Sequence, residues 1–254
     1  MVRIISVVSG KGGVGKTTLV ANLGAYLSSI GKDVLIVDGN LSGANLGLHL
    51  DLPDEYPFSL NRVIKGEIQP SQAIYKHFLG FDILPASITD MHINPRRFKS
   101  ILKNLFKNLS KRRDFIIIDS APGITHEALV SIESSDEVIL VTSPEMPSIV
   151  DILRSKKLAE GKKKKIVGVV VNRTNREDFE VDSQHVEDIL DLPVIANIPE
   201  HKKVRESIAM KKPVVTHSPD SKASIEMKRL AHFLLEEEFP EPGFWQRFLG
   251  IFRK

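Results

Sequence analysis

Cysteine is absent from all 254 residues of this sequence. Its absence excludes disulfide bonds, thiolate zinc sites, cysteine-ligated iron–sulfur clusters and a thiol nucleophile. The eight histidines show no spacing typical of a metal site, so the sequence assigns them no role. The chemistry of this chain must therefore depend on oxygen and amine side chains and on the backbone.

Long apolar runs and a charge excess of one sign are also missing. No segment approaches the ~18–20 apolar residues that span a bilayer, and the N-terminus lacks the apolar region of a signal peptide. Lys and Arg number 35 against 32 Asp and Glu, and this net charge of +3 is too small to imply nucleic-acid binding. We expect a soluble, cytoplasmic globular protein.

Short β-branched runs alternate with longer helical patterns along the chain, and most of the runs are apolar on both faces. This alternation predicts one doubly wound α/β domain with a mainly parallel sheet and helices on both faces. The expected strands are Ile4–Ser9, Val34–Asp38, Phe81–Pro85, Phe115–Asp119, Glu137–Thr142, Ile166–Asn172 and Val194–Pro199. The expected helices are Lys16–Ser29, His126–Ser134, Ser148–Glu160, Ser183–Leu190, Lys202–Met210 and Ser221–Glu238.

A glycine-rich phosphate loop follows the first expected strand and opens the first expected helix. The segment reads G-K-G-G-V-G-K-T and matches the P-loop pattern G-x-x-x-x-G-K-[ST]. Its glycines let successive backbone N–H groups point at phosphate oxygens, and the helix that follows turns its positive dipole end toward the same anion. We expect Lys16 to reach the β/γ-phosphates and Thr17 to bind Mg²⁺. The predicted nucleotide-binding residues of this segment are Gly10, Lys11, Gly12, Gly13, Val14, Gly15, Lys16, Thr17 and Thr18.

Two aspartates stand at the carboxyl ends of expected strands, where open α/β sheets bind ligands. Asp119 ends the run Phe115–Ile118 and resembles a Walker-B residue that holds Mg²⁺ through a coordinated water. Asp38 ends the second strand and is a candidate to orient the attacking water or the switch I segment, or to contact the metal through water. A strand-end aspartate can also be a simple turn former.

The base is predicted to be adenine, with ATP and ADP as the nucleotides. A guanine-reading N-K-x-D element is expected after a strand in GTPases of this architecture, but the corresponding residues are Asn172-Arg173-Thr174-Asn175. Asn172 is a candidate adenine contact, and Pro199 and Glu200 after the last strand could frame the other edge of the base.

The motifs together resemble those of the MinD/ParA-type ATPases over most of the chain, with archaeal MinD and the flagellar relative FlhG as the nearest kinds. The segment 11–18 is similar to their deviant Walker A motif, and the resemblance implies that Lys11 reaches across an ATP-bound homodimer to the partner's phosphates. Residues 37–47 resemble switch I, and residues 119–123 resemble switch II. Ser143-Pro144-Glu145 and Ile198-Pro199-Glu200 follow MinD more than plasmid ParA proteins.

One residue departs from the MinD pattern. MinD proteins usually carry a second aspartate two residues after the first, and this chain has Asn40 there. An amide keeps an acceptor but has no charge and cannot take a proton. If that carboxylate polarises the attacking water, hydrolysis is slow while binding survives; the alternative is that Asn40 is a tolerated switch I substitution. The predicted catalytic residues are Lys11, Lys16, Asp38 and Asn40.

The C-terminal residues form an amphipathic pattern after the breaker Pro240-Glu241-Pro242-Gly243. At 100° per residue the apolar side chains occupy an arc of about 160°, opposite Arg247, Arg253 and Lys254. Such a short basic helix is typical of an interfacial membrane anchor, and MinD proteins end in a similar segment; the alternative is packing against its own domain or a partner protein. The predicted membrane-contacting residues are Phe244, Trp245, Phe248, Leu249, Ile251 and Phe252.

The sequence therefore predicts an Mg²⁺-dependent ATPase domain over residues 1–239, a Pro/Gly hinge over 240–243 and a membrane-targeting helix over 244–254. We expect an ATP-dependent homodimer, peripheral on the anionic inner face of the cell membrane, that positions an unidentified protein partner. Two alternatives stay open. One is a ParA-like module that binds DNA and uses ATP as a timing switch, although nucleic acid is the less favoured partner. The other is a nucleotide-binding regulator with very slow hydrolysis because of Asn40.

Overall fold

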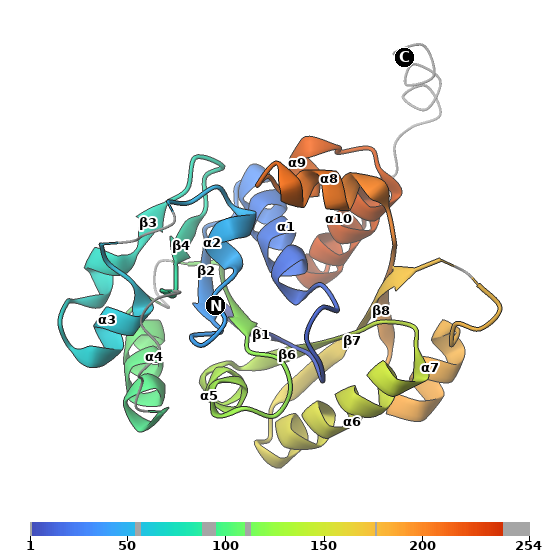
Figure 1. Cartoon of the computed structure of the whole chain (residues 1–254), viewed down its shortest axis with the longest axis horizontal. Helices are drawn as coiled ribbons and strands as arrows, with labels where there is room; N and C mark the ends of the chain where they lie inside the picture. The colour runs from blue at the N-terminus through green and yellow to red at the C-terminus, as the bar shows by residue number, and fades with distance from the viewer. Residues whose placement is uncertain (1, 54–56, 88–94, 110–112, 176, 241–254) are drawn as a thin grey trace, which may run out of the picture.

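A computed structural model describes residues 2–53, 57–87, 95–109, 113–175 and 177–240. Within these residues, eight strands form one sheet in the order β3-β4-β2-β5-β1-β6-β7-β8 (Figure 1). Neighbouring strands are parallel except for β3, which runs antiparallel to β4. The strands are β1 (Arg3–Val8), β2 (Val34–Gly39), β3 (Tyr75–Lys76), β4 (Asp82–Leu84), β5 (Phe115–Ser120), β6 (Glu137–Thr142), β7 (Lys165–Thr174) and β8 (Val194–Pro199).

Helices cover both faces of the sheet, which confirms the predicted doubly wound fold. One face carries α1 (Lys16–Ser29), α8 (Lys202–Ala209), α9 (Val214–His217) and α10 (Lys222–Leu235), seen above the sheet in Figure 1. The other carries α5 (His126–Ser134), α6 (Met146–Gly161) and α7 (Ser183–Leu190). Towards the β3 edge lie α2 (Leu46–His49), α3 (Leu60–Lys65), the 3₁₀ turn Pro70–Ala73 and α4 (Pro95–Leu109).

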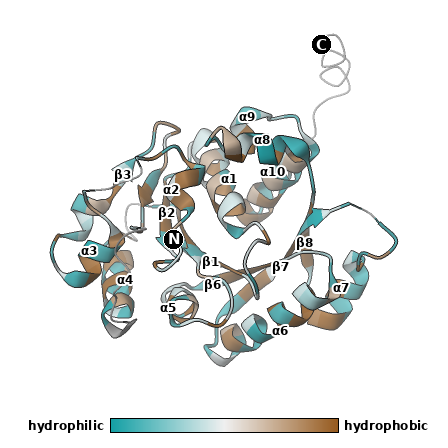
Figure 2. Cartoon of the chain, viewed as in Figure 1, coloured by the Kyte–Doolittle hydropathy of each residue, from teal (hydrophilic) through white to brown (hydrophobic). Residues whose placement is uncertain are grey.

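The central strands are apolar because helices bury both of their faces. Every residue of β2 and β5 is buried, and brown strands run through the centre of Figure 2. Ile5 and Val7 of β1 pack with α1 and α10, whereas Val8 packs with α6 and α7. Because helices pack on both of its faces, β1 is held firmly within the sheet. The loop that follows it is therefore held in position as well.

Most predicted elements are confirmed, with differences at their ends. The expected helix over 221–238 is shorter, since Ser221 is its N-cap and Glu236 takes a left-handed φ of 58° that ends it after Leu235. The prediction missed β3, which has only two residues, and gave no bounds for α4. Both lie at the outer edge of the sheet, where periodicity is weakest.

The predicted hinge and membrane-contacting helix fall largely beyond Pro240 and so lie outside the described residues. Among the described residues, no helix is both long enough and apolar enough to cross a bilayer.

Candidate functional site

The loop between β1 and α1 leads into the helix through glycines with left-handed backbone conformations. Gly15 caps α1 with a left-handed φ of 95°, and no side chain caps that helix end, so its first N–H groups are left for a ligand. Gly10 lies so close to α6 that a Cβ there would stand 2.3 Å from the carbonyl carbon of Asp151. Backbone geometry, as well as phosphate binding, therefore requires glycine at the start of the loop.

Lys16 extends beneath the loop. Its ammonium donates to Ser9 Oγ at 2.7 Å, and Ser9 Oγ donates to the carbonyl of Lys11 at 2.7 Å. Burial lowers the pKa of Lys16, and the charge of Asp119 opposes this shift. A phosphate anion at the loop would restore the charged form, so the burial of Lys16 favours an anionic ligand.

Thr17 and Asp119, the two residues predicted to bind the metal, are in direct contact. The Thr17 hydroxyl donates to Asp119 Oδ2 at 2.6 Å, while Asp119 Oδ1 is buried and has no hydrogen-bond partner among the described residues. Burial raises the pKa of Asp119, against the charge of Lys16 and the Thr17 hydrogen bond. An unpartnered buried carboxylate oxygen beside a threonine hydroxyl fits a hard, oxygen-binding cation such as Mg²⁺ with its waters.

Asp38 lies opposite Asp119 in the β2–β5 register and is 1% exposed. Its two oxygens accept the backbone N–H groups of Asn40 at 3.1 Å and of Leu46 at 3.3 Å. Burial, followed by the charge of Asp119, raises the pKa of Asp38 well above its usual value. The structure thus gives Asp38 a role in shaping the 38–46 loop, in addition to the water-orienting role that the sequence predicts.

The Asn40 side chain forms a hydrogen bond within the same loop, in which Nδ2 donates to the carbonyl of Gly43 at 2.6 Å. Ser42 bonds to Glu127 at the start of α5, with its N–H at 3.3 Å and its hydroxyl at 3.2 Å from Oε2. This link between the switch I segment and α5 could not be found from the sequence. The two residues stand 85 positions apart and match no motif.

Lys11 points to Glu145 at the start of α6, with its ammonium 3.8 Å from the Glu145 carboxylate. Exposed apolar side chains lie on the neighbouring elements: Ile124 after β5 is 56% exposed, Met146 48% and Val150 46%. We call these three residues the apolar rim. It stands beside the loop because Gly123 N–H donates to the Ser9 carbonyl at 2.9 Å.

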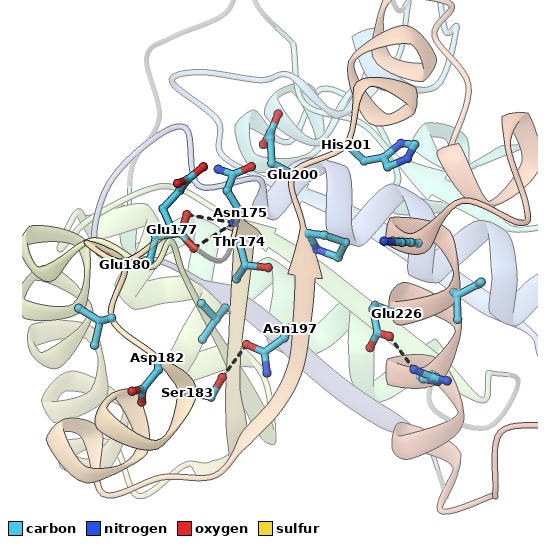
Figure 3. A pocket seen from close by; sticks show the side chains of 16 residues that line it. Thr174, Asn175, Glu177, Glu180, Asp182, Ser183, Asn197, Glu200, His201 and Glu226 are labelled. Atoms are coloured by element: carbon cyan, nitrogen blue, oxygen red, sulfur yellow. Dashed lines mark hydrogen bonds and ion pairs between the residues drawn. The ribbon is translucent and has the colours of Figure 1, made fainter.

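The three candidate adenine contacts divide between two places. Asn172 is buried against the loop and donates from Nδ2 to the Val14 carbonyl at 2.7 Å. Pro199 and Glu200 line a hollow of about 850 Å³ at the β8 edge of the sheet, between α7 and α10. Figure 3 shows Ser183 and Asn197 bonded along one side of it and Glu226 on the α10 side. Val171 and Thr174 also line this hollow, so it begins beside Asn172.

One histidine lies at the site although the sequence assigned it no role. His49 Nε2 is 3.4 Å from the Thr18 hydroxyl, and the charge of His49 lowers the pKa of Asp119. Metal-ligand spacing could not have found it, because its partner belongs to the phosphate loop and not to a second histidine.

Comparisons with known proteins agree with this geometry. The ParA family model, described as an NUBPL iron-transfer P-loop NTPase, matches residues 1–235. An uncharacterized ATP-binding protein of Methanocaldococcus jannaschii is 35% identical over 231 residues, which cover 91% of this chain and 87% of that protein.

Solved structures of MinD proteins share the fold. MinD of Pyrococcus horikoshii, complexed with Mg-ADP, is 34% identical with a TM-score of 0.85, and the match covers 92% of this chain and 96% of that one. A MinC:MinD cell division complex from Aquifex aeolicus contains a chain that is 30% identical with a TM-score of 0.83; the match covers 94% of this chain and 98% of that one.

Proposed function

Because this chain belongs to the ParA/MinD family of P-loop ATPases, we propose that it is an Mg²⁺-dependent ATPase switch of the MinD type. In this proposal ATP drives dimerisation, and the dimer binds an anionic membrane surface through residues 244–254 to position a partner complex. The main support for nucleotide binding is the contact between Thr17 and Asp119 beside the phosphate loop. In the described part of the chain, the second carboxylate oxygen of Asp119 is buried without a hydrogen-bond partner, and no side chain caps the helix that follows the loop.

The residues of the loop have separate tasks in nucleotide binding. The N–H groups from Gly12 to Thr17 contact phosphate oxygens, and Lys16 leaves Ser9 to donate to the β/γ-phosphates. Thr17 and Asp119 hold Mg²⁺, the latter through water; the cation, when bound, neutralises charge on the transferring phosphate. Asp38 keeps switch I in place through Asn40 and Leu46. ATP and ADP are the proposed nucleotides because the guanine-reading N-K-x-D element is missing, and Asn172, beside the loop, is the proposed adenine contact.

Dimerisation is supported by Lys11 and by the apolar rim. The Lys11 side chain is 40% exposed and forms an ion pair with Glu145, which a stronger anion can replace. The rim exposes three apolar side chains next to the phosphate loop, and such a patch is typical of a protein–protein contact. A second copy that covers the rim brings its own Lys11 to the facing phosphates.

Membrane binding is supported by the amphipathic pattern of residues 244–254, which lie outside the described part of the chain. One short helix binds weakly, because it realises only part of the burial energy of its apolar residues. Two copies in a dimer make the second insertion intramolecular and raise the avidity by roughly 10²–10⁴. ATP therefore favours membrane residence, and hydrolysis releases the protein to the cytoplasm.

Co-sedimentation with vesicles of phosphatidylcholine and phosphatidylglycerol tests this coupling. We expect strong pelleting with Mg-ATP, weak pelleting with Mg-ADP, and none for a chain truncated after Gly243. Equal binding in the three samples would refute the coupling. Replacing Phe248 with Glu gives a full-length control that keeps the tail but disrupts its apolar arc.

The partner and the competing activities are separable by other measurements. MinC accompanies MinD in the Aquifex complex, and we propose that this chain likewise engages a protein partner on its ATP dimer. Isolation of proteins retained by an ATP-locked variant identifies this partner.

Salt-dependent DNA binding with Mg-ATP would favour the ParA-like alternative. The iron-transfer function in the description of the family model is disfavoured, because this chain has no cysteine to ligate a cluster.

A further inference from the structure

We propose that His49 is a further nucleotide-binding residue, which acts with Thr18 on the phosphate that this threonine reaches. The inference rests on the proposed nucleotide-binding function and adds a side chain that the P-loop pattern does not contain. It starts from one contact, between His49 Nε2 and Thr18 Oγ1 at 3.4 Å.

The local fold fixes the backbone of His49. It ends the four-residue helix α2, whose first residue, Leu46, is fully buried and bonded to Asp38. Leu50, directly after the helix, is also fully buried, and its carbonyl accepts from His77 Nε2 at 2.9 Å. With both neighbours anchored, the partly exposed His49 side chain is held beside α1.

The hydrogen bonds define which nitrogen faces the site. His49 Nδ1 is 3.0 Å from the Asn45 carbonyl, which can only accept, so Nδ1 carries a proton. Nε2 is therefore the ring nitrogen that faces Thr18. The Thr18 side chain is otherwise nearly buried, at 8% exposure.

A hydroxyl has one proton to donate, and this limits how the pair can bind phosphate. A phosphate oxygen at Thr18 takes the hydroxyl proton, and a ring protonated at Nε2 then donates to the Thr18 oxygen or to the phosphate beside it. Because Nδ1 also carries a proton, the donating ring is the imidazolium, whose charge complements the anionic phosphate. Hydrogen bonds that involve a charged group are stronger than neutral ones.

Three variants of the full-length protein test the assignment by calorimetric titration with Mg-ADP and by steady-state ATPase assays. His49→Leu removes the hydrogen bond, and we expect a Kd for Mg-ADP about 5-fold higher, the size that loss of one net hydrogen bond gives. His49→Gln keeps a donor, so its Kd stays within about twofold of the wild type. His185→Leu is the matched control, because His185 is 72% exposed on α7, and its Kd stays unchanged.

Kinetic parameters separate binding from a merely structural effect. We expect KM for ATP to rise with Kd in His49→Leu while kcat changes by less than about twofold, because His49 contacts neither Asp38 nor Asn40 in the described structure. A wild-type Kd in His49→Leu overturns the proposal, and so does an equal loss in the Gln variant. If His49→Leu does not fold, His49→Ala replaces it under the same criteria. Failure of the proposed function itself has another signature, since wild type then shows no Mg-ADP binding.

Discussion

Lys11 and Glu145 of one chain face each other, with the ammonium 3.8 Å from the carboxylate. The family resemblance implies that the same lysine contacts the phosphates of a partner subunit. In the proposed dimer, Lys11 would exchange this internal carboxylate for an external phosphate, and Glu145 would compete with dimerisation.

Removing this competition should strengthen the dimer. Glu145→Gln keeps an acceptor for the Ser143 hydroxyl but removes the charge, so we expect the ATP-dependent dimer to form about 1.5–5-fold more tightly, as for an exposed ion pair. Sedimentation equilibrium with Mg-ATP and an ATPase-deficient background measures the effect. Lys11→Ala serves as the opposite control, with no ATP-dependent dimer. A weaker dimer for Glu145→Gln would contradict the competition.

Restoring a carboxylate at position 40 should accelerate hydrolysis at a cost in stability. Asn40→Asp supplies a charged acceptor near the attacking water, and we expect at least a tenfold rise in kcat, within the range of general-base effects. The variant also loses the donor to the Gly43 carbonyl, which lowers the free energy of unfolding by about 0.5–1.5 kcal/mol. Phosphate release and urea denaturation measure the two effects. An unchanged kcat would make Asn40 a tolerated substitution in switch I.

Asp119→Asn should separate magnesium binding from fold stability. The pKa of Asp119 is raised, so the protonated form is favoured in the folded protein, and stability falls as pH rises from the unfolded pKa of 3.8 toward the folded one. An amide removes this loss, and we expect a higher Tm at pH 7.5 without nucleotide. The same variant should lose the tightening of ADP binding by Mg²⁺. If Mg²⁺ still tightens ADP binding as in the wild type, Asp119 is not the metal residue.

Two glycines of the loop provide a matched pair for a steric prediction. A Cβ on Gly10 meets the backbone of Asp151 at 2.3 Å, whereas a Cβ on Gly12 meets nothing within 4 Å. Gly10→Ala must displace α6 and should lower the free energy of unfolding by about 1–3 kcal/mol, as overpacking does. Gly12→Ala should change it by less than about 0.5 kcal/mol. Thermal unfolding without nucleotide compares them, and equal Tm values would show that the contact at Gly10 is not tight.

His77 should give the folded protein an acid sensitivity that a single variant removes. Its ring is buried, stacks on Phe81 and accepts the Leu79 N–H at Nδ1. Burial lowers its pKa, against the Leu50 hydrogen bond and the charge of Asp51, so below pH 6.5 the unfolded chain binds a proton that the folded chain excludes.

Stability then falls with decreasing pH, with a slope of at most about 1.4 kcal/mol per pH unit from this group. His77→Gln keeps a donor for the Leu50 carbonyl and does not titrate. Urea denaturation of both proteins from pH 7.5 to 5 isolates the contribution of His77. Parallel pH profiles would assign the acid sensitivity to other groups.

Features that depend on residues close together in the sequence could be predicted, whereas features that depend on distant residues could not. The loop from Gly10 to Thr17 could be predicted because its geometry is local: the glycines, the lysine and the helix that follows determine one another. The place of Asp119 at the carboxyl end of β5 followed from an unbroken apolar run, although the strand continues to Ser120. In contrast, β3 exists only because two residues reach the β4 edge, so no periodic pattern marks it.

Contacts between distant residues could not be predicted in the same way. Glu127 bonds to Ser42 and His49 to Thr18 only because the sheet brings the carboxyl ends of β1, β2 and β5 together. The sequence predicted that Asp38 orients the attacking water or switch I, but not which backbone N–H groups of the loop its two oxygens would accept. Such roles depend on the tertiary arrangement and have no signature in spacing.

Strand β1 lies between the phosphate loop and the last turn of α10, which precedes the proposed membrane-binding segment. Its last residue leads into the phosphate loop, while Arg3 at its start donates to the Leu234 carbonyl and pairs with Glu137. Leu234 lies in the last turn of α10, six residues before Pro240. Arg3 therefore links the last turn of α10 to the strand whose other end leads into the phosphate loop, so one six-residue strand joins the C-terminal side of the described domain to that loop.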